Sequence, residues 1–373
     1  MKKHKKHADI KRPSLGQFGR LELGLIGAPC DVITHMVRSV SASLGQGYNI
    51  TYIDADHHAG EQPLYTNLTD KISHDNIAFQ GSLNDFDRKI LLNQADILLV
   101  NGNHFKSQKQ IVFCTEKKKE SLERKLDRLT DVGLIILDQD ITEPHQYLQT
   151  TLSNYKELSV IGIKEVEQLS NWIKEYYQHQ LPAIKGLVLA GGKSQRMGEN
   201  KALLDYHGEP QVAYAARQFK ALGIDPIISC RKEQADLYAG DYELIHDTFD
   251  GLGPNGAILS AFRSDPDAAW LVTACDQPLL KSEHLQQLIN ERQPNKIATC
   301  FHNPETKFPE PLITLWEPKA YPRLLSFLSM GYSCPRKVLI NSDVYELHVS
   351  ETGFMKNANT PEEREALKAS LIS

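Results

Sequence analysis

The chain has 373 residues, of which 41% are hydrophobic and 24% charged, values typical of a globular protein with one or two domains. Lys and Arg number 42 and Asp and Glu 47, so the formal net charge is −5, which argues against a dedicated nucleic-acid-binding protein. No uncharged apolar run approaches the roughly 20 residues of a membrane span. The six cysteines are scattered without a CxxC pair, which indicates reduced thiols and a cytoplasmic location.

Residues 1–19 are strongly basic and contain one acid, Asp9. No apolar segment follows the basic start, so a signal peptide is not expected. A docking segment for an anionic partner and a metal-binding tract at His4 and His7 are alternatives. A disordered, solvated basic tail fits the composition best.

Residues 20–181 alternate between uniformly apolar and amphipathic segments. Uniformly apolar runs are typical of parallel strands that are buried on both faces of a sheet. Strands are expected near residues 21–27, 49–54, 95–102, 110–115, 132–138 and 158–163, and helices near 32–44, 84–94, 116–129 and 165–180. This order predicts an α/β domain around a mostly parallel, Rossmann-like sheet.

The same pattern restarts at residue 182 and continues to residue 373. Strands are expected near residues 184–190, 225–230, 242–247, 268–276, 296–301 and 343–349, and helices near 209–223, 255–264, 282–292 and 361–370. Two separate openings of strand, turn and helix predict two three-layer αβα domains, which meet at a short linker near Pro182.

The strongest functional signal is the segment LVLAGGKSQRMGENKALLDYHGEP, residues 187–210. A buried strand runs into a Gly-Gly turn, where the absence of Cβ atoms lets backbone N–H groups approach an anion. Several cations follow in the same loop and are suited to neutralise a nucleoside triphosphate. The residues expected to contact the nucleotide here are Leu189, Ala190, Gly191, Gly192, Lys193, Ser194, Arg196 and Lys201.

This segment resembles the signature of the molybdenum cofactor guanylyltransferases (MobA-like NTP transferases), which read L-A-G-G-x-S-x-R-M-G and then a lysine. The segments HDTFDGLGPNGAILSAF, VTACDQPLL and FMKNANTPEE are similar to later family segments and occur in the same order. Asn200 stands where the family usually has Asp before its lysine. The resemblance implies a nucleotide-diphospho-sugar transferase-like fold for residues 182–373.

The resemblance also implies an activity, the transfer of GMP from Mg-GTP to molybdenum-molybdopterin with release of pyrophosphate. Asp276 matches the family's magnesium ligand, and a carboxylate after a strand suits Mg²⁺. The attacking phosphate is already anionic, so no general base is expected. The implied sites are a catalytic set of Lys201, Arg196 and Asp276, a nucleoside contact at Asp247, and a pterin side of Arg336, Asn357 and Asn359.

GTP and molybdopterin are therefore the expected partners, and transient contact with molybdoenzymes or insertion chaperones is left open. LAGG favours GTP, whereas the related cytidylyl-transferring branch more often reads LAAG. Two departures keep CTP open, because Ser229-Cys230-Arg231 stands where an Asn is usual and Pro-Glu-Pro stands where His-Pro is common.

Two alternatives follow for the function. One is a cytidylyltransferase that acts on the same or another phosphorylated acceptor. The other is a non-catalytic scaffold for molybdenum cofactor delivery. Structural roles also remain open, since Asp247 is suited to cap a turn and Asn357 and Asn359 to cap the last helix. Cys230 and Cys275 are expected to be small buried apolar residues.

The opening of the 20–181 domain is similar to a P-loop, G-x-x-x-x-G-K-[ST]. Gly27 and Thr34 align with it, but Val32 and Ile33 stand where Gly and Lys belong, so no competent NTP site is expected. The domain resembles the small P-loop GTP-binding adaptor of molybdenum cofactor synthesis (MobB-like). That resemblance implies a degenerate adaptor retained for docking or stability.

Two further features carry the adaptor resemblance. A His-His segment, His57-His58, follows one strand, and Asn101 stands where the adaptor has an acidic residue. The nearby side chains Asp54, Asp56, His57 and His58 would form a metal cluster only if the loop folded them together. An exposed loop at the strand's end is the favoured interpretation.

Overall fold

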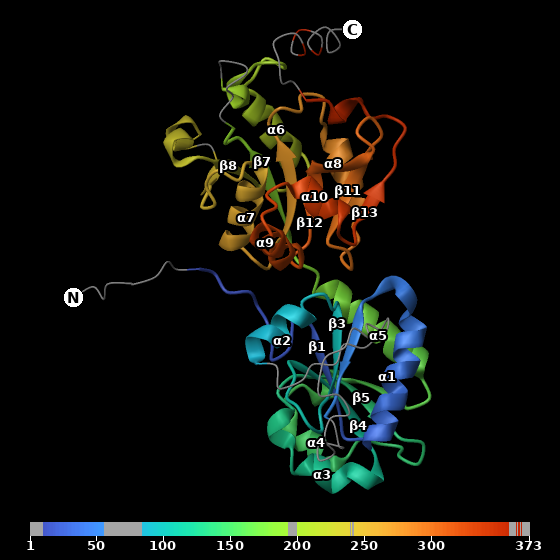
Figure 1. Ribbon diagram of the computed structural model, residues 1–373. Coiled ribbons are helices and arrows are strands. Elements are labelled where there is room, and N and C mark those ends of the chain that lie inside the picture. The colour runs from blue at the N-terminus through green and yellow to red at the C-terminus, as the bar shows by residue number, and fades with distance from the viewer. Residues whose placement is uncertain are drawn as a thin grey trace, which may run out of the picture. The chain divides into compact units, whose positions relative to one another are not determined.

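The computed structural model describes residues 10–55, 84–192, 200–238, 240, 242–357, 363, 365 and 367. The chain divides into two compact units, Ser14–Leu181 (the N-terminal unit) and Pro182–Ser373 (the C-terminal unit) (Figure 1). Residues 10–13 belong to the C-terminal unit, where Lys11 Nζ lies 2.6 Å from Asp265 Oδ1. The predicted fold class, two three-layer α/β domains, is confirmed.

The N-terminal unit is built on a six-stranded sheet in the order β2-β3-β1-β4-β5-β6. Every neighbouring pair of strands is parallel, as the uniformly apolar runs predicted. The strands are β1 (Glu22–Ile26), β2 (Ile50–Ile53), β3 (Ile97–Asn101), β4 (Lys109–Cys114), β5 (Val132–Leu137) and β6 (Ser159–Gly162).

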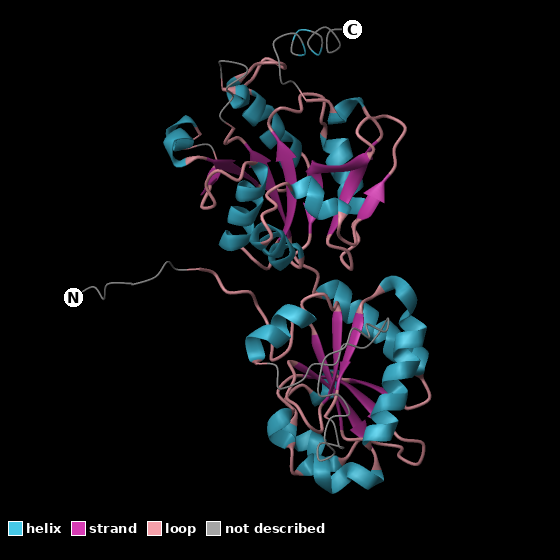
Figure 2. Ribbon diagram, in the orientation of Figure 1, coloured by secondary structure: helices cyan, strands magenta, loops and turns pink. Residues whose placement is uncertain are grey.

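Helices cover both faces of this sheet (Figure 2). One face packs against α1 (Cys30–Leu44) and α5 (Val166–His179). The other face packs against α2 (Asp85–Leu92), α3 (Lys119–Glu123) and α4 (Gln146–Thr151). Short 3₁₀ turns complete the unit: η1 (Gly45–Gly47), η2 (Glu116–Lys118), η3 (Leu126–Arg128) and η4 (Tyr155–Glu157).

The helix predicted over residues 116–129 is wrong, because this segment forms η2, α3 and η3 in place of one continuous helix. Two of its cations are bound to the loop that follows β3. Lys125 Nζ donates to the carbonyl of Asn103 at 3.0 Å, and Arg128 Nη1 donates to the carbonyl of Gly102 at 2.9 Å. These tertiary contacts compete with the regular helical path that the leucine spacing predicted.

The predicted end of the N-terminal tail at residue 19 is also wrong. Phe18 is only 1% exposed and packs with Leu98 and Val100 of β3. The Glu22 carboxylate accepts hydrogen bonds from the N–H groups of Phe18 and Gly19. An aromatic side chain therefore anchors the chain to the N-terminal unit before residue 20.

The C-terminal unit is built on a seven-stranded sheet in the order β13-β11-β12-β10-β7-β8-β9. β12 is antiparallel to both of its neighbours, and the other pairs are parallel. The strands are β7 (Ile184–Leu189), β8 (Pro226–Cys230), β9 (Glu243–His246), β10 (Ala269–Ala274), β11 (Ala298–Asn303), β12 (Phe308–Trp316) and β13 (Tyr345–Leu347).

β12 was not predicted, although it lies between β10 and β11. Prolines usually exclude a central strand because they lack a backbone N–H donor. Here Pro309 lies beyond an irregularity in the β11–β12 pairing, between Cys300 and His302. The β10–β12 pairing covers Ile313–Trp316, so the prolines lie outside its regular part.

Helices also cover both faces of the second sheet. One face carries α6 (Gln211–Lys220) and α8 (Ser282–Asn290), and the other carries α7 (Pro254–Ser264), α9 (Ala320–Ser329) and α10 (Pro335–Ile340). The 3₁₀ turns are η5 (Lys201–Leu203), η6 (Lys232–Leu237) and η7 (Gly353–Met355). The helix predicted over residues 361–370 lies almost wholly outside the described residues. In the part of the chain that the structure describes, no helix is long and apolar enough to cross a membrane.

A buried ion pair between Arg292 and Glu317 gives a testable prediction for the stability of this unit. Arg292 Nε and Nη2 lie 2.7 and 2.8 Å from the two Glu317 oxygens, and Glu317 is 1% exposed. Arg292→Met leaves that carboxylate buried and unpaired, so we expect the free energy of unfolding to fall by about 3–5 kcal/mol in urea denaturation. The double variant Arg292→Met/Glu317→Leu should recover most of the loss. A loss below about 1 kcal/mol for the single variant would contradict the argument.

Candidate active site

The candidate site lies at the carboxyl ends of four neighbouring parallel strands in the C-terminal unit. β10, β7, β8 and β9 are adjacent, and their pairing aligns Leu189 with both Ala274 and Ser229. The segments that leave these strands therefore emerge at one edge of the sheet. Open α/β sheets bind ligands at such an edge, where the strand order reverses direction.

Lys201 and Asp276 meet at this edge although they are 75 positions apart in the sequence. Lys201 Nζ lies 3.3 Å from Asp276 Oδ2, and the two side chains are 18% and 20% exposed. Asn200 precedes η5 and caps it, since its Oδ1 accepts from the Ala202 N–H at 3.1 Å. Its Nδ2 also donates to the Tyr238 hydroxyl at 3.2 Å. Asn200 thus fixes the turn that places Lys201.

Asp276 fits the chemistry expected of a magnesium ligand. Its Oδ1 is buried and has no hydrogen-bond partner among the described residues, while Oδ2 faces Lys201. A carboxylate oxygen with an unused lone pair is a ligand that Mg²⁺ prefers. The following loop is held in place, because His207 Nε2 lies 2.8 Å from the Pro278 carbonyl oxygen. Asp276 is the described residue that would hold the ion.

The two cysteines near the site are buried thiols, as predicted. Cys230 is 0% exposed and Cys275 is 7% exposed. Burial, with the charge of Asp276 as a second cause, raises the pKa of Cys275 to about 12. Burial, assisted by Asp247, raises the pKa of Cys230 to about 11. Both therefore remain protonated near neutral pH and are not nucleophiles.

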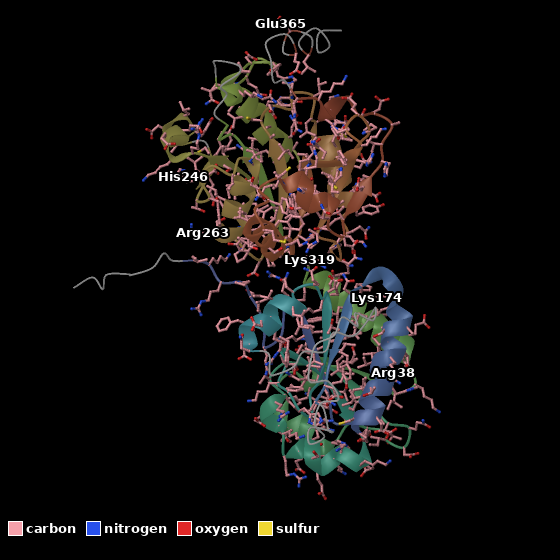
Figure 3. The ribbon with its side chains drawn as sticks, viewed as in Figure 1. Arg38, Lys174, His246, Arg263, Lys319 and Glu365 are labelled. Carbon is pink, nitrogen blue, oxygen red and sulfur yellow. The ribbon has the colours of Figure 1, made fainter. Side chains whose placement is uncertain are left out.

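Asp247 begins the segment after β9, next to His246, which is labelled at the surface in Figure 3. Its Oδ1 accepts a hydrogen bond from the Ser229 hydroxyl at 2.9 Å. A Cβ atom at Gly191 would lie 3.4 Å from Asp247 Oδ2, so the glycine turn passes close to this carboxylate. Burial is the largest influence on the Asp247 carboxyl and raises its pKa.

The backbone groups of Leu189 and Ala190 form hydrogen bonds to the neighbouring strands. The Ala190 N–H donates to the Ser229 carbonyl at 2.8 Å, and the Leu189 carbonyl accepts from the Cys275 N–H at 3.2 Å. Gly191 and Gly192 then leave the sheet without regular secondary structure, and this pair is called the glycine turn. The predicted contacts Lys193, Ser194, Arg196 and Asn359 lie outside the described residues.

Arg336 on α10 lies near a buried carboxylate that the sequence analysis gave no role. Its Nη2 is 3.6 Å from Glu310 Oε2, and Glu310 is 4% exposed. Asn303 Nδ2 approaches the same Glu310 oxygen at 3.4 Å. Burial raises the pKa of Glu310, and the charge of Asp276 raises it further.

The register of β12 explains why Glu310 is close to Asp276. β10 and β12 are antiparallel, with Thr273 opposite Ile313. Asp276 follows Thr273 by three residues and Glu310 precedes Ile313 by three, so both carboxylates lie just beyond the same end of this pairing. Arg336 is thus brought to the Asp276 side of the sheet. Asn357 follows η7, and its Oδ1 is buried without a partner in the described part of the chain.

Arg231 is the second residue whose role the sequence analysis missed. It follows β8, and its guanidinium reaches the turn after β7: Nε donates to the Gly191 carbonyl at 2.9 Å and Nη2 to the Gly192 carbonyl at 3.3 Å. The signal near Arg231 was the run Ser229-Cys230-Arg231 at the place where an Asn is usual. The sequence feature that could have drawn attention to Glu310 is its position between two prolines, next to an apolar run.

At the carboxyl edge of the N-terminal sheet, the segments that follow β1 and β3 are hydrogen-bonded to each other. The Gly27 N–H donates to Asn103 Oδ1 at 3.3 Å, and Asn103 Nδ2 donates to the Ala28 carbonyl at 2.8 Å. Ile33, which stands at the P-loop lysine position, is 0% exposed in the core. An apolar core side chain offers no charge to a phosphate.

The metal cluster considered at residues 54–58 is described only in part. Asp54 accepts from the Tyr52 hydroxyl and from Asn101 Nδ2, both at 2.8 Å. Asp56, His57 and His58 lie outside the described residues. Across the residues that the structure does describe, no group of three or more His, Cys, Asp or Glu side chains is arranged to hold a metal ion.

Comparison with known proteins identifies relatives of the C-terminal unit. A family model described as "MobA-like NTP transferase domain" matches residues 186–343. A molybdenum cofactor guanylyltransferase of Pseudomonas putida is 31% identical over 185 residues, which cover 49% of this chain and 96% of that protein. A molybdenum cofactor biosynthesis bifunctional protein of Synechocystis sp. is 32% identical over 179 residues, 48% of this chain.

The aligned part spans about half, 52%, of that bifunctional protein's length. Among solved structures, molybdopterin-guanine dinucleotide biosynthesis protein A from Archaeoglobus fulgidus is 24% identical, with a TM-score of 0.44. The matched region covers 50% of this chain and 98% of that chain.

Proposed function

Because the C-terminal half of the chain belongs to the MobA-like NTP transferase family of the molybdenum cofactor guanylyltransferases, we propose that it transfers GMP from Mg-GTP to molybdenum-molybdopterin. The products would be molybdopterin guanine dinucleotide cofactor and pyrophosphate. The observation that carries the proposal is the 3.3 Å approach of Lys201 to Asp276 at the carboxyl edge of β7 and β10. A cation and a carboxylate in contact at that edge supply the charges that a metal-bound triphosphate requires.

Each described residue has a part in the proposed reaction. Lys201 would neutralise the phosphate charge, and the glycine turn would let the chain approach the triphosphate without a Cβ in the way. Asp247 would seat the nucleoside beside Gly191. Asp276 would hold Mg²⁺, which when bound polarises the phosphates and stabilises the leaving pyrophosphate. Since the acceptor's phosphate is itself an anionic nucleophile, positioning and charge neutralisation supply the catalysis.

Arg336 and Asn357 are proposed for the acceptor side, together with Asn359. Arg336 carries a cation suited to a phosphate monoester, and its Nε is buried without a hydrogen-bond partner among the described residues. Asn357 likewise offers a buried, unpartnered Oδ1. Unsatisfied polar atoms of this kind are expected where a bound ligand completes the hydrogen bonds.

The test is incubation of the full chain with Mg²⁺, molybdenum cofactor and each labelled nucleoside triphosphate, with products identified by mass. We expect a GMP adduct of the cofactor and stoichiometric pyrophosphate. A CMP adduct formed in preference would replace the guanylyl assignment by the cytidylyltransferase alternative. Binding of the cofactor without any adduct or pyrophosphate would favour the non-catalytic scaffold. Protection against thermal unfolding by Mg-GTP and Mg-CTP ranks the two nucleotides independently of turnover.

For the N-terminal unit we propose a degenerate P-loop adaptor that serves docking or stability. The support is the resemblance of its opening segment together with the Gly27–Asn103 hydrogen bond and the buried Ile33. Equilibrium dialysis of the full chain should then find one GTP per chain. A second bound GTP that persists in a Lys201→Gln variant would contradict the lack of a nucleotide site in this unit.

A further inference from the structure

The Gly191–Gly192 turn is held by a side chain from a neighbouring strand. Arg231 donates from Nε to the Gly191 carbonyl at 2.9 Å and from Nη2 to the Gly192 carbonyl at 3.3 Å. β7 and β8 are parallel neighbours, with Leu189 aligned to Ser229. Residues 191 and 231 therefore leave adjacent strands at the same edge, and the guanidinium spans the gap between them.

Hydrogen bonds immediately before and after Arg231 in the chain hold its backbone in place. Before it, β8 ends at Cys230, whose carbonyl accepts from the Asp247 N–H at 3.2 Å. After it, Arg231 is the N-cap residue of η6, and its N–H donates to Gln234 Oε1 at 3.3 Å. A planar, always-charged guanidinium on such a base presents its donors in one fixed direction.

These two hydrogen bonds decide the orientation of the turn's peptide groups. In a trans peptide the carbonyl of one residue and the N–H of the next point in opposite directions. With the Gly191 carbonyl held on Arg231, the Gly192 N–H points away from the arginine. Glycine has the most backbone freedom to lose, so an unanchored Gly-Gly turn would sample many conformations before it met a phosphate.

The charge of Arg231 also acts on Asp247, the residue proposed to contact the nucleoside. Asp247 lies next to Gly191, and burial raises its pKa, while the arginine's charge acts in the opposite direction. One guanidinium thus contacts the glycine turn and counters the charge of the carboxylate beside it. Neither effect requires Arg231 to touch the nucleotide.

We propose that Arg231 is a positioning residue for the nucleotide, one that locks the Gly191–Gly192 turn in the conformation that receives the triphosphate. The inference rests on the proposed function and extends it to a residue that binds the protein backbone in place of the substrate. A triphosphate that meets a preorganised turn binds without first ordering it, so the arginine's contribution is expected in nucleotide affinity and not in the chemical step.

The test compares two substitutions in the full chain. Arg231→Gln removes both the charge and the paired N–H donors of the guanidinium group. Arg231→Lys keeps the charge but loses the paired donors. We expect both variants to raise the KM for Mg-GTP by about 10- to 100-fold, with kcat within about threefold of the unsubstituted chain. Lys232→Gln is the matched control, because its exposed side chain carries the same charge next to Arg231 and should leave both constants unchanged.

Hydrogen exchange gives a readout in the absence of nucleotide. The amides of Gly191 and Gly192 should exchange about tenfold or more faster in Arg231→Gln than in the Lys232→Gln control. Saturating Mg-GTP should remove most of that difference. Urea denaturation should show the same free energy of unfolding within about 1 kcal/mol, which separates positioning from general stability.

Two results would overturn the inference. One is an unchanged KM in Arg231→Gln while the unsubstituted chain binds Mg-GTP. The other is a normal KM in Arg231→Lys, which would mean that the charge of the side chain sets the affinity for the nucleotide and the paired guanidinium donors do not. Failure of the proposed function is distinguishable, because then the unsubstituted chain itself would bind and convert no nucleotide.

Discussion

Asp276→Asn is expected to lower kcat for nucleotidyl transfer by about 10³-fold or more, measured as pyrophosphate release at saturating Mg-GTP. The substitution keeps the size of the side chain but removes the negative charge that would hold the ion. Because Asp276 Oδ1 has no hydrogen-bond partner in the described structure, the exchange to an amide breaks no internal contact at that atom. At the other oxygen the substitution weakens the ion pair with Lys201, whose partners are both partly exposed, so the free energy of unfolding should fall by no more than about 1 kcal/mol.

Metal binding provides a second readout for the same variant. Mn²⁺ in place of Mg²⁺, followed by electron paramagnetic resonance in the presence of GTP, should show weaker binding to Asp276→Asn. Asp343→Asn is the matched control, since Asp343 is 62% exposed and pairs with Lys296 at the surface. Exposed ion pairs contribute little, so its activity should be normal. Pyrophosphate release that is unchanged in Asp276→Asn would remove this residue from the reaction.

Lys201→Gln is expected to lower kcat/KM for GTP by about 10²- to 10³-fold. Its ammonium group lies at the edge where phosphates would bind, 3.3 Å from Asp276 Oδ2. Without it, the Asp276 carboxylate would repel the triphosphate until an ion neutralised it. Steady-state kinetics at several Mg²⁺ concentrations measure the effect, and the loss should shrink as Mg²⁺ rises.

The control for this variant is Lys281→Gln, because the Lys281 side chain is 63% exposed and its Nζ lies 3.8 Å from the surface carboxylate of Glu283. Lys201→Arg should recover part of the activity, since it restores the charge with a different geometry. A Lys201→Gln variant with normal kcat/KM would show that the triphosphate is neutralised elsewhere.

Most strands could be predicted because their signal is local. β1, β3, β4 and β10 are short apolar runs, and each is almost wholly buried in the structure. Such runs identify parallel strands without any knowledge of their neighbours. β12 escaped prediction because Pro309 and Pro311 argue against a strand, and only its pairing partners show where the ladder tolerates them.

Helix prediction failed where tertiary contacts compete with the local pattern. The leucines of residues 116–129 have helical spacing, yet Lys125 and Arg128 hydrogen-bond to the loop after β3. The sequence contains no sign of those carbonyl partners. The same holds for Phe18, whose burial depends on β3 side chains that lie far along the chain.

Two α/β domains, a glycine pair followed by cations, and an aspartate at the end of a buried strand could all be predicted from local sequence. Each of these depends on residues next to one another, so periodicity and spacing are enough to find it. The contacts between distant groups, Arg231 with the Gly191 carbonyl and Glu310 with Arg336, became visible in the folded chain alone. Strand order and register bring these residues together, and both arise from packing between segments that no local pattern encodes.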